Sequence, residues 1–287
     1  MSEDLSRIRD VSDTALWVAI YRADESDRKD ALFHDPYARR LAGERGRQIV
    51  EGMRRGRTWS WPMVVRTQVF DETVLATLRE GFDTVLNLAA GLDARPWRLD
   101  LPPATRWFDV DMPGMTEYKQ QAMAGETPRC RYTALAADLR DAAVRRKLFE
   151  DVGRESRRTL VIAEGLLIYL APADVGALAD DLAAVPAFQR WLIDLASPAL
   201  LEMMRKRLRG PAGLENAPFL FAPAESTGFF TPHGWREREY HSTLVEAERL
   251  RRTFPFAWFW KLMMPFMPKA RRDVFQRFSG YVVLERT

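Results

Sequence analysis

The chain has 287 residues, of which 47% are hydrophobic, so it is long enough for one large α/β domain or two small ones. Its 43 basic and 40 acidic residues are intermixed and leave a net charge of +3, which favours solvated arginine-rich faces over nucleic-acid binding. The single cysteine, Cys130, excludes an internal disulfide, and the three histidines, His34, His233 and His241, are too far apart in sequence to favour a metal site. The sequence contains neither a long apolar run nor a signal peptide, which predicts a cytoplasmic protein without a membrane partner.

The N-terminal part of the chain is predicted to be helical. Residues 12–26 begin with a capping pattern and continue with apolar residues, which predicts a helix covered on most sides. Arg22 ends that apolar stretch, so it is a candidate for binding an acceptor carboxylate, with a structural ion pair as the alternative. The pair Asp35-Pro36 predicts the start of a second helix. Residues 43–58, rich in glycine and arginine, predict a mobile and solvated segment.

A long helix over residues 61–79, closed by Gly81, is predicted to place Arg66 and Phe70 one turn apart. The short apolar run Thr84–Leu88 then predicts a strand that is buried on both faces.

The strand Thr84–Leu88 leads into a turn of small residues that ends at Gly91. About 20 residues later, Asp111 ends a second predicted strand over 106–111, and an acid at that place is where ribose hydroxyls are bound. Asp109 lies on the same face, but only Asp111 is at the carboxyl end of the strand. The order of strand, turn, helix, strand and acid therefore predicts a site for an adenosine-bearing cofactor.

Two more predicted strands are followed by acids. Residues 129–138 end at Asp138, and the run Thr159–Ala163 is followed directly by Glu164. A buried charge such as Glu164 is costly unless it is paired or lies at a site. The ends Gly91, Asp111, Asp138 and Glu164 together predict a cofactor site at the carboxyl edge of a parallel sheet.

The remaining chain is predicted to complete the sheet, with strands at 188–196, 235–241 and 278–286. Residues 197–235 interrupt the pattern, and an insertion of that length is typical of a lid over an active site. We expect this lid to be mobile without ligand, with apolar contacts from Phe219, Phe221, Phe229 and Phe230. The aromatic, proline-rich residues 254–268 predict a pocket wall, a membrane-facing patch or packed core.

Taken together, these stretches resemble the leucine carboxyl methyltransferase family, in particular its bacterial branch of small-molecule O-methyltransferases, which includes polyketide carboxyl methyltransferases. The matching stretches are Thr14–Ala19, Asp35–Ala38, Arg66, Asn87–Leu99, Phe108–Met112, Asp138–Arg140 and Glu164–Leu170. The resemblance implies a class I methyltransferase fold: a doubly wound, Rossmann-like α/β domain with a seven-stranded, mostly parallel sheet. It also implies S-adenosylmethionine as the cofactor.

By resemblance, the cofactor contacts fall on residues of the predicted strand ends. Arg66 would bind the methionine carboxylate, Glu164 the methionine amino group, and Asp111 the ribose hydroxyls. Asp138 and the Leu139 N–H would bind the adenine.

The turn departs from the family pattern, because it reads Leu88-Ala89-Ala90-Gly91 where the family has Leu-Gly-Ala-Gly. Ala89 and Gly91 are kept as cofactor-binding residues. Since alanine does not adopt positive φ cheaply, either the Ala89 backbone is ordinary or cofactor affinity is reduced.

We therefore expect one methyltransferase domain over 1–287, in four parts: a helical cover (1–80), a cofactor-binding core (81–196), the lid (197–235) and a return to the sheet (236–287). The expected reaction is O-methylation of a small organic acid or phenol in secondary metabolism, by a monomer or homodimer. A carboxylate acceptor is favoured because it needs no base and the motifs contain no histidine. Tyr169 is the candidate catalytic residue and, with Arg22, the candidate acceptor-binding residue.

Three alternatives stay open. The protein could methylate a protein C-terminus, or be an NAD-dependent oxidoreductase, although the G-x-G-x-x-G turn of that class is absent. A non-enzymatic nucleic-acid-binding module is suggested only by the pI of about 9.1.

Overall fold

The computed structural model describes residues 12–52, 60–207, 218–253, 268 and 275–287. Its centre is a seven-stranded sheet with the order β3-β2-β1-β4-β5-β7-β6. The strands are β1 (Thr84–Leu88), β2 (Arg106–Asp111), β3 (Arg131–Ala136), β4 (Thr159–Ala163), β5 (Phe188–Ala196), β6 (Trp235–Ser242) and β7 (Ser279–Arg286). The first five run parallel, and β7 is antiparallel to both β5 and β6. The predicted doubly wound, mostly parallel α/β sheet is thus confirmed.

The central strands are where the sequence predicts them because they are buried on both faces. Every residue of β1 and β4 is buried, in keeping with their unbroken apolar and β-branched runs. The edge strand β3 is only partly covered. Parallel pairing in register brings Leu88 beside Val110, and Asn87 beside Ile162. The carboxyl ends of β1, β2 and β4 therefore meet at one edge of the sheet.

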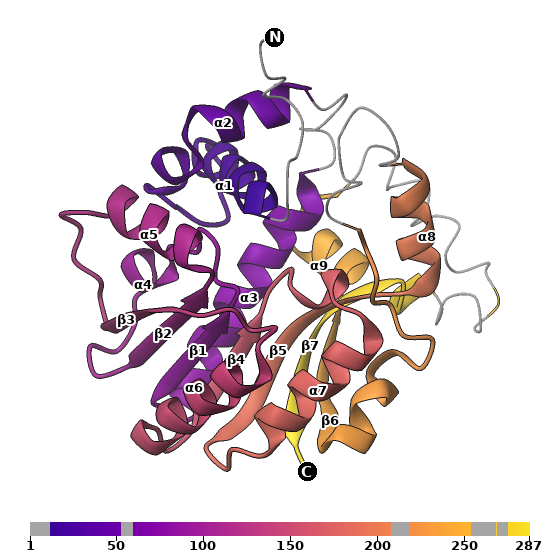
Figure 1. Ribbon diagram of the computed structural model, residues 1–287. Helices are drawn as coiled ribbons and strands as arrows, with labels where there is room; N and C mark the ends of the chain where they lie inside the picture. The colour runs from indigo at the N-terminus through magenta and orange to yellow at the C-terminus, as the bar shows by residue number, and fades with distance from the viewer. Residues whose placement is uncertain (1–11, 53–59, 208–217, 254–267, 269–274) are drawn as a thin grey trace, which may run out of the picture.

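Helices cover both faces of the sheet (Figure 1). One face is covered by α6 (Ala142–Glu155), α7 (Pro172–Ala183) and the 3-10 helix η4 (Ser226–His233), and the other by α3 (Trp61–Arg79) and α9 (Thr243–Arg249). Two short elements, α4 (Arg95–Arg98) and η2 (Leu167–Tyr169), follow β1 and β4, while α5 (Pro113–Ala122) follows β2 and α8 (Pro198–Arg207) follows β5.

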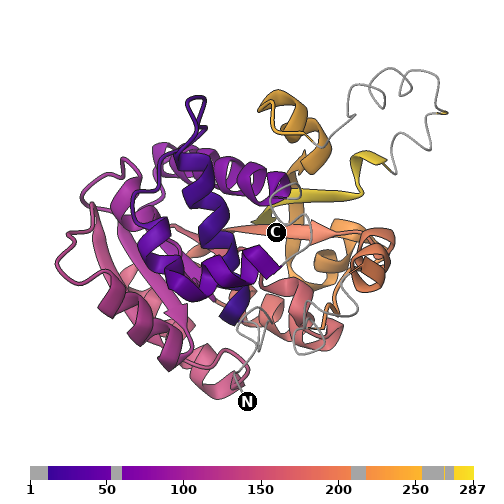
Figure 2. The same ribbon diagram turned by 90° about the horizontal axis from the view of Figure 1, so that it is seen from above.

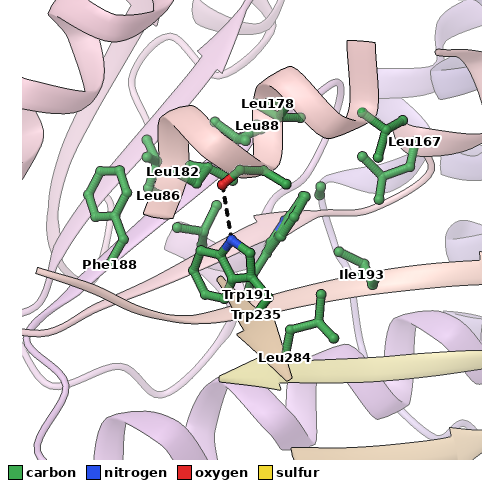
Figure 3. Close-up of a cluster of buried hydrophobic side chains, with 14 of the residues drawn as sticks. Leu86, Leu88, Leu167, Leu178, Leu182, Phe188, Trp191, Ile193, Trp235 and Leu284 are labelled. Carbon is green, nitrogen blue, oxygen red and sulfur yellow. Dashed lines mark hydrogen bonds between the residues drawn. The ribbon is translucent and has the colours of Figure 1, made fainter. Parts of the chain in front are cut away.

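The larger core cluster lies between β1, β4 and β5 and the helices α6 and α7 (Figure 3). Trp191 on β5 contacts Phe230 and Trp235 edge-on, with ring centroids 5.4 and 5.6 Å away. The Trp235 indole N–H donates to the Ala179 carbonyl oxygen at 3.0 Å. The tryptophans thus join β5 and β6 to α7.

The N-terminal cover consists of α1 (Ser12–Ser26) and α2 (Ala38–Gly52), which pack side by side (Figure 2). The prediction of a solvated segment from residue 43 is wrong as far as residue 52; residues 53–59 lie outside the described part. Gly46 is a packing residue, since a Cβ there would lie 2.9 Å from the Leu16 carbonyl oxygen. Gly43, at φ 60°, kinks the helix. Gly46 thus permits close contact between the two helices. Amino-acid composition alone does not distinguish a glycine in such a helix contact from a glycine in a loop.

The predicted lid, residues 197–235, packs on the domain wherever it is described. Phe221 and Phe230 are buried members of the main core cluster, so these two side chains pack in the core, while the mobility of the segment stays a prediction. The Leu220 and Phe221 amides both donate to the Ile168 carbonyl oxygen, at 2.7 and 3.2 Å. The prediction for residues 254–268 falls almost wholly outside the described residues. None of the described helices is both long and apolar enough to cross a membrane.

Candidate functional site

The turn after β1 and the carboxyl end of β2 are bonded to each other. The Gly91 N–H donates to Asp111 Oδ2 at 2.6 Å, and the Met112 N–H donates to Asp111 Oδ1 at 2.8 Å. An ionised carboxylate offers about four lone-pair sites, so each Asp111 oxygen keeps acceptor capacity beyond these two bonds. Burial raises the pKa of Asp111, while the two backbone bonds oppose that rise. The carboxylate is therefore fixed in direction and still able to accept from a ligand.

The turn itself settles how the chain accommodates alanine where the family pattern has glycine. Ala89 has φ 48° and Gly91 φ 49°, so both are in the left-handed region. Ala89 therefore adopts the strained backbone rather than an ordinary one. Gly91 also lies against α1, where a Cβ would come within 3.2 Å of the Ala15 Cβ. The turn is thus held between Asp111 and α1.

Replacing Ala89 with glycine is expected to raise the free energy of unfolding by about 1 kcal/mol, because the left-handed strain of a residue with a Cβ exceeds the extra chain entropy of glycine. The matched control is Ala90→Gly. Ala90 is outside the left-handed region, so this change is expected to cost about 0.5–1 kcal/mol. Urea unfolding measures both variants. Equal destabilisation by the two glycines would contradict the strain at Ala89.

Glu164 lies beyond β4 between two arginines. Arg66 Nε donates to Glu164 Oε1 at 2.9 Å, and Arg95 Nη1 donates to Oε2 at 2.8 Å. Burial alone would raise the pKa of Glu164, but Arg95 and Arg66 together hold it below its ordinary value. Glu164 is therefore ionised at neutral pH, with its side chain still 16% exposed.

Arg66 on α3 also reaches a third carboxylate. Its Nη1 donates to Asp194 Oδ2 at 3.1 Å, while the Gly165 N–H donates to Asp194 Oδ1 at 2.6 Å. Within the described residues, Arg66 Nη2 makes no hydrogen bond. Gly165, at φ 67°, packs on the guanidinium, and a Cβ there would lie 3.2 Å from Nη1. The predicted pair of Arg66 and Glu164 is brought together, with one guanidinium nitrogen left for a further partner.

Behind Glu164, Arg95 is the centre of a buried ion-pair network. Its Nε donates to Asp71 at 2.6 Å, and its Nη1 donates to Asp93 at 2.7 Å as well as to Glu164. Arg98 binds both oxygens of the same Asp71, at 2.6 and 2.7 Å. The network fixes the β1 turn, α3 and the end of β4 to one another.

Asp109 is part of the support beneath the site rather than of its surface. Its carboxylate accepts from Asn87 Nδ2, Trp107 Nε1, Lys119 Nζ and the Tyr132 hydroxyl, at 2.7–3.1 Å. The structure confirms that only Asp111 lies at the carboxyl end of β2, and its contact with the ribose stays a prediction. Removing Asp109 would also leave the buried Lys119 ammonium group without its carboxylate partner.

Asp138 and Leu139 follow β3 at the same edge. The Asp138 carboxylate forms a bidentate pair with Arg140 at 2.7–3.1 Å, and this pairing lowers its pKa. The Leu139 N–H makes no hydrogen bond to any described residue, while the Leu139 carbonyl oxygen accepts from Arg145 at 2.7 Å. A backbone donor is therefore available here, but the Asp138 side chain already has a partner.

Tyr169 on η2 lies at the boundary between the charged residues and an apolar region. Its ring packs on Phe219 at a centroid distance of 5.6 Å. Burial raises the pKa of Tyr169, while a hydrogen bond with the Thr14 side chain and the Arg66 charge oppose the rise. Tyr169 is thus a neutral hydroxyl near Arg66, and no base.

Arg22 lies elsewhere in the N-terminal cover. Its Nε donates to Asp35 at 2.9 Å and its Nη2 to the Leu92 carbonyl oxygen at 2.5 Å. The pair with Asp35 is the structural ion pair that the sequence left open, and the bond to Leu92 joins α1 to the β1 turn. The structure does not bring Arg22 into the group formed by Arg66, Glu164 and Tyr169.

The sequence reasoning missed three members of the site: Asp194, Arg95 and Asp93. Asp194 interrupts the apolar β5 run Trp191–Ala196, and a buried charge in such a run was the same signal that identified Glu164. Asp93 and Arg95 stand next to the recognised turn, but no spacing rule says that Arg95 turns inward.

The comparisons with known proteins agree with this geometry. A family model described as leucine carboxyl methyltransferase matches residues 15–183. A relative from Parafrankia sp. (strain EAN1pec), whose name describes an S-adenosyl-L-methionine-dependent methyltransferase, is 36% identical over 259 residues, which are 85% of this chain and 83% of the relative. A similarly named relative from Streptomyces avermitilis is 32% identical over 249 residues, covering 82% and 86% of the two chains.

Solved structures show the same fold at lower identity. A DUF574 family protein from Streptomyces avermitilis superposes with a TM-score of 0.58 at 16% identity, over 94% of this chain and 97% of that one. A structure from Thermobifida fusca, described as that of a methyltransferase, gives 0.59 at 17% identity, over 99% and 97%. These likenesses extend over nearly the whole chain, including the N-terminal cover.

Proposed function

Because the chain belongs to the leucine carboxyl methyltransferase family and is an S-adenosylmethionine-dependent methyltransferase, we propose that it methylates an oxygen of a small organic acid or phenol, with a carboxylate as the favoured acceptor. The observation that carries the choice of carboxylate is the state of Tyr169. Burial raises the pKa of Tyr169, which favours its neutral hydroxyl, and a neutral hydroxyl is a poor proton acceptor for a phenol. A carboxylate acceptor is already ionised and needs no base.

The unused bonding capacity at the site supports the proposed cofactor contacts. Arg66 Nη2 would bind the methionine carboxylate and Glu164 the methionine ammonium group, since opposite charges pair with charge-assisted hydrogen bonds. The two Asp111 oxygens would accept from the ribose hydroxyls, and the Leu139 N–H would donate to the adenine ring. Asp138, paired with Arg140, would contribute at the same end. The Ala89–Gly91 backbone would line the cofactor.

When bound, S-adenosylmethionine would supply a sulfonium methyl group for in-line transfer to the acceptor oxygen, and the electron pair of the broken S–C bond would stay on sulfur. No proton is transferred when the acceptor is a carboxylate. The residues of the chain then have to orient the acceptor and exclude water, and proximity alone supplies a large part of such a rate enhancement. Tyr169 and Arg66 would do this from the two sides of the boundary between charged and apolar residues.

The pH dependence of turnover tests the acceptor class. With an apolar carboxylic acid as acceptor, kcat/KM is expected to be flat from about pH 6 to 9, because the acceptor ionises near pH 4–5. A phenol acceptor, with a pKa near 10, would instead give a rate that rises about tenfold per pH unit over that range.

The product provides a second measurement. A methyl ester is cleaved by mild base, whereas an aryl methyl ether is not. Base-stable product combined with a rising pH profile would contradict the carboxylate assignment. Methylation of peptide C-termini in preference to small acids would favour the family's protein-directed alternative.

A further inference from the structure

An apolar cluster adjoins the charged residues of the site. It is formed by Trp17 on α1, Ile49 on α2, Tyr169 on η2, Leu201 and Met204 on α8, and Phe219. We call this group the α1–α8 cluster. It joins the N-terminal cover to the segment that follows β5, and its surface is aromatic and aliphatic. Such walls bind the hydrophobic body of a small ligand, while a few polar groups fix its orientation.

The α1–α8 cluster is anchored on two sides by hydrogen bonds to backbone carbonyl oxygens. The Leu220 N–H donates to the Ile168 carbonyl oxygen at 2.7 Å, and Arg205 Nε on α8 donates to the Phe219 carbonyl oxygen at 2.8 Å. Phe219 is therefore held between η2 and α8. Met204 is the unbranched and most adaptable of the aliphatic members, so it is the one suited to yield to a ligand.

Tyr169 connects the α1–α8 cluster to the cofactor residues. It belongs to the cluster through its ring, while its hydroxyl lies in the electrostatic reach of Arg66 and Asp194. A molecule whose body lies against the cluster would therefore present one end toward the charged residues, where the methyl group is to be received.

The α1–α8 cluster also contains an unsatisfied hydrogen-bond donor. Trp17 Nε1 is buried and has no hydrogen-bond partner among the described residues. Two other described indole N–H groups are paired: that of Trp107 donates to Asp109 at 2.8 Å, and that of Trp235 to the Ala179 carbonyl oxygen at 3.0 Å. A buried donor without a partner lowers stability, so its presence calls for a reason.

In the part of the chain that the structure describes, Trp191 Nε1 is likewise buried without a hydrogen-bond partner, but it lies in the main core, where it contacts the rings of Phe230 and Trp235. The two tryptophans therefore differ in what could reach them. Of this pair, Trp17 is the part-exposed one, and it packs in the same cluster as Tyr169.

We propose that the Trp17 Nε1–H binds an oxygen of the methyl acceptor, and that the acceptor is an apolar or aromatic carboxylic acid whose body displaces side chains of the α1–α8 cluster. This assignment rests on the proposed function and names the acceptor class for that site. One carboxylate oxygen accepts from Trp17, and the other is left to receive the methyl group.

The first test follows the indole N–H signals of the full chain by NMR with ¹⁵N-labelled tryptophan, with Trp17→Phe used to identify the Trp17 signal among the nine tryptophans. The probe is trans-cinnamate, added in the presence of S-adenosylhomocysteine, the demethylated cofactor. The Trp17 signal is expected to move downfield more than any other, because a new hydrogen bond to a carboxylate forms there. The Trp191 signal is expected to stay in place, and acetate, which lacks the apolar body, is expected to move neither.

The second test is kinetic. Trp17→Phe is expected to raise the KM for cinnamate about ten- to hundredfold, the loss of one hydrogen bond to a charged group. Cofactor affinity and melting temperature should change little, since the variant keeps an aromatic ring and removes an unpaired donor. Tyr21→Phe, one turn along the same helix, is the control and should leave the KM unchanged.

The outcomes separate this inference from the proposed function. If cinnamate is methylated while the Trp17 signal stays in place and Trp17→Phe keeps its KM, the Trp17 assignment is overturned and the O-methyltransferase stands. If cinnamate moves the Trp17 signal but no methyl ester forms with S-adenosylmethionine, the binding assignment holds and the proposed reaction fails. If cinnamate has neither effect, the assigned acceptor class is wrong.

Discussion

Replacing Arg95 with methionine is expected to lower the free energy of unfolding by about 3–5 kcal/mol, the cost of removing one partner from a buried charge network. Arg95 is 2% exposed and binds Asp71, Asp93 and Glu164. Without Arg95, the three carboxylates lose a shared cationic partner, and their burial makes the ionised state unfavourable. Methionine retains most of the side-chain length, so the loss is mainly electrostatic rather than a cavity.

Two further substitutions sharpen this experiment, each measured by urea unfolding at pH 7. Arg95→Lys should recover only part of the loss, because an ammonium group cannot match the planar geometry of a guanidinium bound on several sides. Arg154→Met is the control: Arg154 pairs with Asp151 and Glu150 on the surface of α6 and should cost less than about 1 kcal/mol. Equal effects at positions 95 and 154 would mean that the network contributes nothing beyond surface pairs.

The same network predicts the direction of the pH dependence. Burial opposes ionisation of Asp93 and Glu164, yet Arg95 and its neighbouring cations lower the pKa of both below their ordinary 3.8 and 4.5. A carboxyl whose pKa is lowered by folding stabilises the protein above its unfolded pKa and loses that contribution as the pH falls. The difference between wild type and Arg95→Met should therefore be largest near neutral pH and shrink below about pH 4.5.

Replacing Asp111 with alanine is expected to weaken S-adenosylhomocysteine binding by about 1.5–3 kcal/mol, or ten- to hundredfold, as measured by calorimetry. Two effects weaken the binding. The variant removes the proposed acceptor for the ribose hydroxyls, and it frees the Gly91 N–H that Asp111 now holds at 2.6 Å. Both effects act on binding at the β1 turn.

The control for Asp111 has to be an acid that binds backbone amides away from the site. Asp109→Ala is unsuitable, because Asp109 pairs with the buried Lys119. Asp83 accepts from the Arg157 and Arg158 amides at the opposite, amino end of β1. Asp83→Ala should lower stability and leave cofactor affinity within about twofold. Similar losses of affinity in both variants would indicate general loosening of the fold and not a ribose contact.

The sequence by itself determined the central sheet and the edge of that sheet at which the cofactor is proposed to bind. Apolar runs such as Thr84–Leu88 and Thr159–Ala163 predict strands correctly. A strand that is buried on both faces needs apolar residues at successive positions, whereas a surface strand alternates apolar and polar residues. Acids placed directly after these runs were predictable for the same reason: a charge next to a buried strand is costly unless it has a partner. Asp111 and Glu164 follow from local pattern alone.

Tertiary structure decided the partners of those charges. Arg95 and Asp194 are far from Glu164 in sequence, and only the packing of α3, the β1 turn and β5 brings them to it. The same holds for Gly46, which reads as a loop signal but serves the close contact of α1 with α2, and for Phe221 and Phe230, whose burial depends on α7 and β5. Periodicity and composition describe what a residue prefers locally, whereas these roles depend on which distant surface folding places against it.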